Sequence, residues 1–515
     1  MRFPLTALVL LTILTRVIIF LKIEVISNDG IFYVQIAKLL SEGKYNEIYF
    51  PFILYPVLIS LVQKLIEDWE LSGRLISIMV STATVIPIFL LGRRLYNERV
   101  AWLSALFYIF LPNILRYSTD LLRDPTGWFL MVLTIWLVWL GHQRGRPVFF
   151  GLASLTAGLG SLTRLEGFVI WGVSILFIAF CGKEGLSLMK RALNVALLGI
   201  VFPLFLFVFL LLAGNYSGRT DLDALLAHPV SLLRSYLTMI LQMPDSIRAV
   251  DEKAYGSLPV ISQSFRELVR SYKPVLVASE VAYKLVKCAN VLCIPIVFAL
   301  WIRLKRGFDA ADRYLLSVWA ALLGMSFVYT WESNYFSTRH GLTLLFPCFF
   351  FAGLGLIEIA ERFSRIPDRV AWRRVSIKNI SVPVLTSLVI FVLLIQAPDF
   401  LTVRKEKDKG EMKIIGIWLK ENGYGGSAIM GPSRLSRLAF YAEARFIEMP
   451  GSWEKVIESI HQNGVRIVVV DSCATERDYP GLRANLLRAG VARLEGPKYE
   501  SGNCATEIYW VHKGS

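Results

Sequence analysis

The feature that most constrains this chain is a series of apolar runs, each close in length to a membrane-spanning helix. The hydrocarbon core of a bilayer is about 30 Å thick, so a helix that crosses it needs about 20 mainly apolar residues. Such runs lie at residues 4–22, 73–91, 100–115, 126–140, 147–163, 167–181, 192–213, 286–302, 314–331, 341–357 and 380–397. The two runs between residues 147 and 181 are short. We therefore predict an all-α polytopic membrane domain of about eleven helices.

The composition agrees with this class and argues against a nucleic-acid partner. Only 18% of the residues are charged and the mean hydropathy is +0.53, whereas soluble domains carry about 25% charged residues. The formal net charge is +15, but residues 398–515 hold 17 basic and 15 acidic residues. The basic excess therefore lies in the first 397 residues, where basic side chains flank membrane spans on the cytoplasmic side.

The distribution of charge between the loops predicts the orientation in the membrane. Alternate connections are strongly basic and should face the cytoplasm. These connections lie at residues 93–99, 144–146, 183–191, 303–306 and 362–378. The segment from Glu24 to Arg74 carries seven acidic and four basic residues, so we place it outside. The first run shows no small-residue cleavage pattern and is interpreted as a retained span. We predict a multi-pass plasma-membrane protein with a cytoplasmic N-terminus and an extracytoplasmic C-terminus.

The pattern divides the chain into a membrane domain, residues 1–397, and a C-terminal domain, residues 398–515. The membrane domain has long outer loops at about 24–72 and 214–285. The C-terminal region loses membrane hydropathy and alternates helical and strand patterns, which predicts a small extracytoplasmic α/β domain. Helices are expected at Glu411–Asn422, Trp453–Asn463 and Leu482–Ala489, and strands at Gly426–Met430, Val465–Asp471 and Thr506–Val511.

Several kinds of site have little support in the sequence. Four of the six cysteines fall in or beside spans, and Cys473 and Cys504 in the C-terminal region are equally compatible with a disulfide and with two free thiols. The sequence has five histidines and neither a CxxC nor an HExxH motif, so a zinc site is not indicated. The absence of a GxxxxGK[ST] motif argues against a nucleotide-driven pump.

The first outer loop places a carboxylate close to the membrane boundary. Asp29 follows the first span, and Tyr33 is four residues further on, so both lie on one face of a predicted interfacial helix. Asn28 or Asp29 is a natural N-cap for that helix, and capping is one interpretation of Asp29. The other is a general base, because a carboxylate at the mouth of an apolar cavity can deprotonate an acceptor hydroxyl.

Two further segments concentrate charge between spans. Residues 116–125 hold Asp120, Arg123 and Asp124, followed by a proline; Asp124 here either begins the next helix or belongs to a site, and Arg123 either reaches lipid headgroups or serves that site. In the turn at residues 160–167, Arg164 is expected to face a cavity, and Glu166 to pair with it and hold the turn together.

A third arginine, Arg339, begins the tenth predicted span on the outer side and is followed by His340. An arginine at this place either anchors the helix at the interface or binds a phosphate. The guanidinium group suits phosphate because its planar donors match the phosphate oxygens and its charge persists in a low dielectric. We do not assign His340 a catalytic role.

These segments together resemble the GT-C class of membrane glycosyltransferases, which includes protein O-mannosyltransferases and the aminoarabinose transferases of lipid A. The resemblance rests on Asp29-x-x-x-Tyr33 with Pro51-x-x-x-Tyr55-Pro56, the acidic loop at 116–125, the Thr-Arg-x-Glu-Gly turn at 163–167, the late arginine and the C-terminal domain, in that order. Many relatives have a second acid in the first loop, where this chain has Asn28 and Gly30. The Trp-Trp-Asp-Tyr-Gly signature of oligosaccharyltransferases is absent.

The resemblance implies roles for the candidate residues. Asp29 matches the aspartate regarded as the catalytic base. Asp124, with Asp120 as the weaker candidate, matches an acid that holds the acceptor or, in metal-dependent relatives, a metal. Arg339 matches an arginine near the donor phosphate, with Arg164 and Arg123 as further phosphate ligands. The implied reaction requires no cofactor and leaves a divalent metal optional.

The function predicted from the sequence is transfer of a sugar from an isoprenoid phosphate to a hydroxyl acceptor on the extracytoplasmic face, with inversion. Lipid, glycan and protein acceptors all remain open. A lipid-linked donor fits this side of the membrane because nucleotide sugars are not available there. The alternative is a transporter or flippase of a lipid-linked saccharide, although the internal repeat typical of many transporters is not visible.

Overall fold

The computed structural model of the chain describes residues 5–22, 25–48, 52–181, 187–217, 263–365, 410–450, 453–471, 481–488, 491–494, 496, 500–501 and 504–511. Internal contacts divide the chain into two compact units. The membrane unit comprises residues 1–19 and 36–403, and the C-terminal unit comprises residues 20–35 and 404–515. The C-terminal unit thus includes a segment from near the start of the chain, whereas the sequence pattern alone draws one boundary at residue 398.

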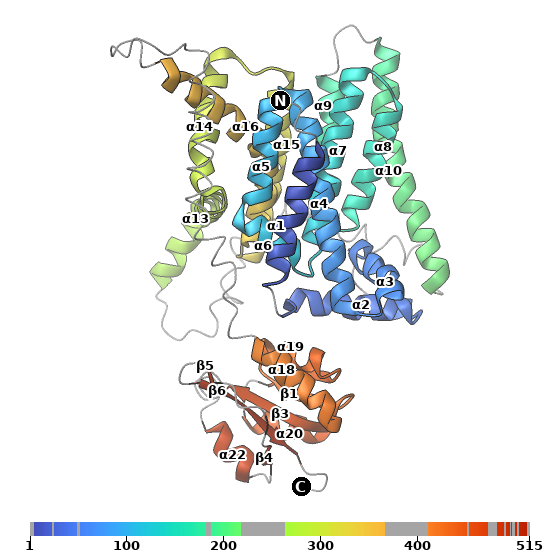
Figure 1. The fold of residues 1–515 in the computed structure, drawn as a ribbon, viewed down its shortest axis with the longest axis vertical. Helices are drawn as coiled ribbons and strands as arrows, with labels where there is room; N and C mark the ends of the chain where they lie inside the picture. Colours follow the sequence, from blue (N-terminus) through green and yellow to red (C-terminus); the bar gives the residue numbers. More distant parts are fainter. Residues whose placement is uncertain are drawn as a thin grey trace. The chain divides into compact units, whose positions relative to one another are not determined.

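The helices from α1 to α16 account for the described part of the membrane unit, and α2 crosses into the C-terminal unit. Most of them run side by side along one direction (Figure 1). They are α1 (Leu5–Phe20), α2 (Asn28–Ser41), α3 (Leu54–Ile66), α4 (Trp69–Leu95), α5 (Glu98–Phe110), α6 (Pro112–Thr119), α7 (Asp124–Arg144), α8 (Val148–Ser161), α9 (Glu166–Phe180), α10 (Leu188–Ser217), α13 (Gln263–Ala289), α14 (Cys293–Arg306), α15 (Ala310–Ser333) and α16 (Thr338–Arg365).

Six helical segments in the described part of the chain are long and apolar enough to cross a bilayer, and a seventh is counted if α5 and α6 form one bent span. The protein is therefore a multi-pass membrane protein, and the eleven predicted spans are not confirmed by the described residues. The helices α1, α8 and α9 have 16, 14 and 15 residues. At 1.5 Å per residue, such helices extend about 21–24 Å, less than the hydrocarbon core. The span expected at 380–397 lies outside the described residues.

The core of the membrane unit forms where α7 packs against α4, α8 and α9. Its largest side chains are aromatic: Trp128 on α7, Tyr108 on α5 and Phe346 on α16 are all nearly inaccessible to solvent. The Trp128 and Phe346 rings lie 5.6 Å apart and those of Tyr108 and Phe346 lie 5.9 Å apart. This packing holds the first turns of α7 and α16 against each other, and both turns carry charged residues.

The break between α5 and α6 is stabilised by a buried arginine. Pro112 lacks an N–H, so it cannot donate to the carbonyl four residues earlier, and the two helices meet at 62°. Arg16 of α1 is fully buried; its Nη2 donates to the Tyr108 carbonyl, which Pro112 cannot serve, at 3.4 Å, and its Nη1 donates to the Ile109 carbonyl at 2.8 Å. Its guanidinium also lies 5.0 Å from the Tyr108 ring centre. Arg16 thereby replaces part of the missing helical bonding and joins α1 to the broken span.

The C-terminal unit is built on a mixed sheet with strand order β2-β1-β3-β6-β4, and β5 pairs with β6. The strands β1 and β2 are parallel, as are β1 and β3, while β6 runs antiparallel to β3, β4 and β5. The strands are β1 (Ala428–Gly431), β2 (Arg445–Glu448), β3 (Val465–Asp471), β4 (Ala492–Leu494), β5 (Glu500–Ser501) and β6 (Cys504–Trp510). The strand expected at Val465–Asp471 is β3, whereas β2, β4 and β5 have no counterpart in the sequence analysis.

Helices lie on both faces of this sheet. On β3, Ile467 and Val469 pack towards α18 (Gly410–Leu419) and α19 (Ser436–Tyr441), while Val468 and Val470 pack towards α20 (Trp453–Gln462) and α22 (Leu482–Arg488). Side chains alternate along a strand, so the unbroken apolar run of β3 supplies both cores. The partner proposed for Cys504, Cys473, lies outside the described residues.

Candidate functional site

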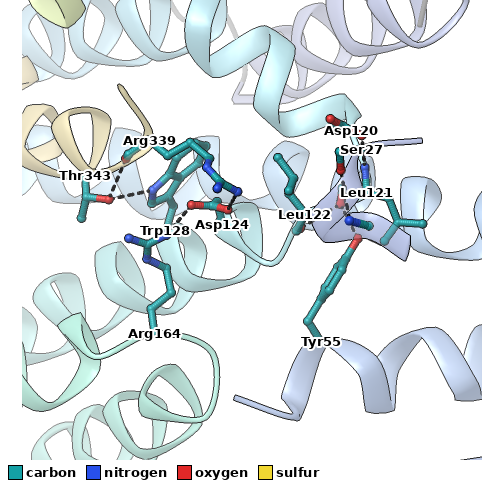
Figure 2. A network of polar contacts seen from close by, with 12 residues as sticks. Ser27, Tyr55, Asp120, Leu121, Leu122, Asp124, Trp128, Arg164, Arg339 and Thr343 are labelled. Atoms are coloured by element: carbon teal, nitrogen blue, oxygen red, sulfur yellow. Dashed lines mark hydrogen bonds and ion pairs between the residues drawn. The ribbon is translucent and has the colours of Figure 1, made fainter. Parts of the chain in front are cut away.

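Four charged side chains meet where α7, α9 and α16 begin. The Asp124 carboxylate in the first turn of α7 accepts a hydrogen bond from Nη1 of Arg164 and lies 3.6 Å from Nη1 of Arg339. Figure 2 shows the two arginines on opposite sides of this carboxylate. Asp124 is 1% exposed, whereas the Arg339 side chain is 29% exposed. The sequence segments at 116–125, 160–167 and 339–340, far apart along the chain, therefore form one site in the membrane unit.

Arg164 has a partner for each of its guanidinium nitrogens. Its Nε and Nη2 donate to Oε1 of Glu166 at 2.9 and 2.6 Å, and its Nη1 donates to Asp124. The side chains of Arg164 and Glu166 are both under 10% exposed. The interpretation of Glu166 as a partner that holds the turn agrees with this geometry. Arg164 lies at the cavity as expected, but it is shared between two carboxylates.

Two glycines make the close approach of α7 and the 160–167 turn sterically feasible. A Cβ atom on Gly127 would lie 2.7 Å from Cδ of Arg164. A Cβ atom on Gly167 would lie 2.4 Å from the backbone nitrogen of Ser161, and real Cβ contacts below 3.0 Å are essentially not observed. The glycine of the Thr-Arg-x-Glu-Gly turn therefore serves packing, and Gly127 provides the space in which Arg164 reaches Asp124.

A second hydrogen-bond network fixes the turn that leads into α7. The Tyr55 hydroxyl of α3 donates to the Gly73 carbonyl of α4 at 2.9 Å and lies 2.8 Å from Oγ of Ser77. Oγ of Ser77 in turn donates to the Leu122 carbonyl at 3.2 Å. Tyr55, part of the Pro51-x-x-x-Tyr55-Pro56 segment, is fully buried. The network therefore couples α3 and α4 to the backbone two residues before Asp124.

The start of α16 is held by a third set of contacts. Nε1 of Trp128 donates to Oγ1 of Thr343 at 3.1 Å, and Oγ1 of Thr343 donates to the Arg339 carbonyl at 3.4 Å (Figure 2). The His340 ring packs edge-on against Tyr329 with ring centres 4.6 Å apart. These contacts hold the backbone of the first turn of α16, which carries the Arg339 side chain.

A cavity of about 150 Å³ opens beside this charged cluster. Arg123, Arg164, Glu166 and His340 line its polar side. The apolar side consists of Phe52, Leu165, Leu322, Met325, Tyr329, Phe336 and Leu344. The Arg123 guanidinium lies 4.4 Å from the ring centre of Phe52. A small anionic group attached to an apolar chain fits a cavity of this chemistry, because the cations neutralise the anion and the aromatic side accepts the chain.

The other predicted site residues lie in different settings. Asp120 accepts a hydrogen bond from the Leu121 amide at 2.8 Å, so its carboxylate contacts the local backbone. Asp29 and Tyr33 belong to the segment that groups with the C-terminal unit. Asp29 is partly exposed in the first turn of α2, and Tyr33 is 4% exposed.

The helix that carries Asp29 is capped by Ser27. Oγ of Ser27 accepts a hydrogen bond from the Gly30 amide at 3.1 Å, and the Ser27 carbonyl accepts one from the Ile31 amide at 3.1 Å. This is the bonding of an N-cap residue. The interpretation of Asn28 or Asp29 as the N-cap is therefore wrong. The reason is that α2 begins one residue earlier than the acidic pattern indicates.

Within the described residues, no group of three His, Cys, Asp or Glu side chains is arranged to hold a metal ion.

The sequence did not indicate several residues that build the site. Thr343, Trp128, Ser77 and Gly127 hold or accommodate the charged groups, and their only sequence signal is a polar or small residue within an otherwise apolar run. Phe52 gave no signal, because an aromatic residue beside a membrane span is ordinary.

Part of the chain matches a known protein family. Residues 51–211 match the sequence model of the family described as dolichyl-phosphate-mannose-protein mannosyltransferase. That range includes Tyr55, Asp124 and Arg164. No curated protein matches the chain at a significant level.

Solved structures share the fold over most of the chain. ArnT from Cupriavidus metallidurans in the apo state has a TM-score of 0.55 at 12% identity, with 98% of each chain covered. The same protein bound to undecaprenyl phosphate has a TM-score of 0.53 at 12% identity, with 97% of each chain covered. The apo oligosaccharyltransferase of Archaeoglobus fulgidus has a TM-score of 0.55 at 12% identity, covering 91% of this chain and 70% of that one. The chain thus resembles the mannosyltransferase family over residues 51–211 and shares the fold of two membrane glycosyltransferases of the GT-C type.

Proposed function

We propose that this protein transfers a sugar from an isoprenoid-phosphate donor to a hydroxyl acceptor on the extracytoplasmic side of the membrane. The observation that carries the proposal is the cavity of about 150 Å³ in which Arg123 and Arg164 face aromatic and aliphatic side chains inside a membrane unit. Two comparisons support it. The matching family is described by a dolichyl-phosphate-mannose donor, and a structure with the same fold is bound to undecaprenyl phosphate.

The charge of the site suits a phosphodiester. Asp124 and Glu166 contribute two negative charges, and Arg123, Arg164 and Arg339 contribute three positive ones, which leaves a formal charge of +1. A sugar linked to a lipid through one phosphate carries a single negative charge. The bound donor would neutralise the site, and this matters because an uncompensated charge is costly in a low dielectric.

The three arginines have different roles in this proposal, because they differ in how many hydrogen bonds they make to the acids of the site. Arg164 is shared between Asp124 and Glu166, so its main part is to hold these acids and to add positive potential at the cavity. Arg339 lies 3.6 Å from Asp124 and is partly exposed, and its planar guanidinium would donate to phosphate oxygens. Arg123 approaches from the Phe52 side. Asp124 then orients the arginines, and holding the acceptor is a second role for this acid.

Asp29 is the general base in this proposal. Its carboxylate would take the proton of the acceptor hydroxyl as the oxygen attacks the anomeric carbon opposite the phosphate, which inverts the configuration there. The bond to the phosphate breaks, and the lipid phosphate leaves with the electron pair, its charge stabilised by the arginines. The reaction balances without a cofactor. Tyr33, four residues after Asp29 on the same helix, would contact the acceptor.

The orientation belongs to the same proposal. A cytoplasmic N-terminus and an extracytoplasmic C-terminal unit place Asp29 on the side where lipid-linked donors are the available form of activated sugar. Lipids, glycans and proteins with free hydroxyl groups are the candidate acceptors.

The direct test is to incubate the purified protein with a panel of radiolabelled polyprenyl-phosphate sugars, mannose first, and a membrane extract. We expect one donor to transfer label to an acceptor fraction, and the R339A variant to transfer far less. A protein that binds donors but transfers no label from any of them, while moving them between the leaflets of a vesicle, would establish the transporter alternative.

A further inference from the structure

The C-terminal unit contains the segment that carries Asp29. Residues 20–35 group with residues 404–515 although almost 400 residues separate them in sequence. Two side chains from α19 make the connection. The Tyr441 hydroxyl accepts a hydrogen bond from the Ile26 amide at 2.9 Å, and Nε of Arg437 donates to Oδ1 of Asn28 at 2.8 Å. The two bonded positions lie three and one residues before Asp29.

Both contacts involve groups that are costly to leave without a partner. Ile26 is fully buried, Arg437 is 8% exposed and Tyr441 is 9% exposed. The Ile26 amide precedes the first turn of α2 and has no place in the hydrogen bonding of that helix. A buried amide without a partner is strongly unfavourable, so the Tyr441 hydroxyl favours one conformation of the chain at this point.

The helix that supplies these side chains is itself firmly held. α19 packs on α18 so closely that a Cβ atom on Gly416 would lie 2.5 Å from the Leu438 carbonyl oxygen and 2.6 Å from Cβ of Tyr441. The ammonium group of Lys413, also on α18, lies 5.1 Å from the centre of the Tyr441 ring. Tyr441 and Arg437 therefore project from a rigid part of the C-terminal unit.

The cap at Ser27 explains why these contacts reach Asp29. Ser27 satisfies the first turn of α2, so the Asn28 side chain is available to accept from Arg437. With Ile26 and Asn28 both held, the backbone on either side of Ser27 is fixed, and Asp29 follows directly in a helix that continues to Ser41. The position of the Asp29 carboxylate is thus determined jointly by Ser27 and by α19.

We propose that Arg437 and Tyr441 are positioning residues for Asp29, so that the C-terminal unit maintains the general base in its working position. This inference rests on the proposed function, in which Asp29 is the base. It assigns the C-terminal unit a part in the reaction that does not depend on contact with the sugar or the phosphate.

The first experiment measures the contact itself. Hydrogen exchange in the full-length protein, reconstituted in lipid, is followed by mass spectrometry on a peptide that covers residues 25–32. Y441F keeps the ring and removes the hydroxyl, and we expect amide exchange in this peptide to rise about tenfold. Y509F is the matched control, because Tyr509 is 3% exposed in the same unit and its hydroxyl bonds to Glu507 instead. Peptides from β3 report whether each variant remains folded. Unchanged exchange at residues 25–32 in a folded Y441F protein would overturn the proposal.

The second experiment measures the coupling to Asp29 by a double-mutant cycle. In label transfer from polyprenyl-phosphate mannose, or the donor found active in the panel, Y441F should lower kcat about tenfold with little change in the donor KM. In the D29N background, the same substitution should have no further effect, because the base through which Tyr441 acts is already gone. A further tenfold loss in the double variant would show that Tyr441 acts independently of Asp29 and would refute the positioning role.

Two additional outcomes separate this inference from the function on which it rests. R437K keeps the charge but loses the planar Nε donor, and we expect it to behave as Y441F does in both experiments; wild-type behaviour of R437K would count against Arg437. Full activity of D29N alone would refute the base assignment, whereas a normal Y441F turnover beside an inactive D29N would refute only the positioning by the C-terminal unit.

Discussion

At the scale of single residues, the site depends on arginines whose environments differ sharply. Arg164 is buried with three bonded nitrogens, whereas Arg339 is partly exposed and close to one carboxylate. The sequence presents both simply as arginines beside apolar runs. That they approach one carboxylate follows from the packing of α7 against α9 and α16, which a residue pattern does not encode.

Substitutions at Arg339 test the assignment to phosphate. R339K preserves the charge but loses the planar fork, and R339A loses both. We expect the efficiency of donor use to decrease from wild type to R339K to R339A, mainly through a higher donor KM. An interfacial anchor would tolerate lysine, because lysine also reaches the headgroups. Identical donor titrations of wild type and R339K would return Arg339 to the anchor interpretation.

Substitution of Arg164 tests its structural part. R164M leaves two buried carboxylates with fewer partners, and breaking a buried ion pair costs about 3–5 kcal/mol. We expect a clearly lower Tm in detergent micelles. R306M is the control, since the pair of Arg306 with Glu358 is largely exposed and such pairs contribute about 0–1 kcal/mol. Equal losses of Tm in the two variants would contradict the described geometry.

At the scale of elements, small residues decide how closely the helices carrying the site approach. The helix beginning at Asp124 and the strand at Val465–Asp471 follow from apolar runs and their boundaries. The bonding of Arg16 beside the break at Pro112 and the approach of Arg164 to Gly127 do not, because each involves a partner far away in sequence. The cap at Ser27 is a local bond to Gly30, but Asn28 and Asp29 beside it are equally good cap residues by type. Helices α1, α8 and α9 follow predicted apolar runs but have only 16, 14 and 15 residues, and the runs of α8 and α9 are already short in the sequence.

Gly127 provides the test at this scale. A methyl group there would meet Cδ of Arg164 at 2.7 Å, so G127A should displace Arg164 from Asp124. Overpacking of this kind costs about 1–3 kcal/mol, and we expect lower stability together with reduced transfer. G172A on α9 is the control, because a Cβ atom there meets nothing within 4 Å. Thermal unfolding and label transfer are measured on both variants. A G127A protein with the Tm and the transfer rate of wild type would refute the close contact.

At the scale of the whole molecule, the class of protein could be predicted from hydropathy and charge alone. The apolar runs predict multi-pass insertion, and the order of the motifs along the chain carries the GT-C resemblance. The grouping of residues 20–35 with residues 404–515 could not be predicted. It depends on hydrogen bonds of Ile26 and Asn28 with α19, and nothing in the sequence around either residue indicates that contact.

The proposed orientation is tested with single cysteines in otherwise cysteine-free protein, labelled in intact cells with an impermeant thiol reagent. Cysteines replacing Lys44 and Lys420 should react, and those replacing Arg144 and Arg306 should not. All four native side chains are exposed, so accessibility within the fold does not confuse the result. The reverse pattern would place the site on the side of nucleotide sugars and remove the case for a lipid-linked donor.

If this protein forms a glycosidic bond with Asp29 as the base, the D29N variant should lose that reaction while remaining folded. Asparagine keeps the size of the side chain, and Ser27 still caps the helix, so the variant should fold and insert normally. Loss of a general base lowers the rate by about two to four orders of magnitude. We predict a loss of that size in the rate of label transfer from the polyprenyl-phosphate sugar, with donor binding retained. A D29N protein that transfers label at the wild-type rate would contradict the account.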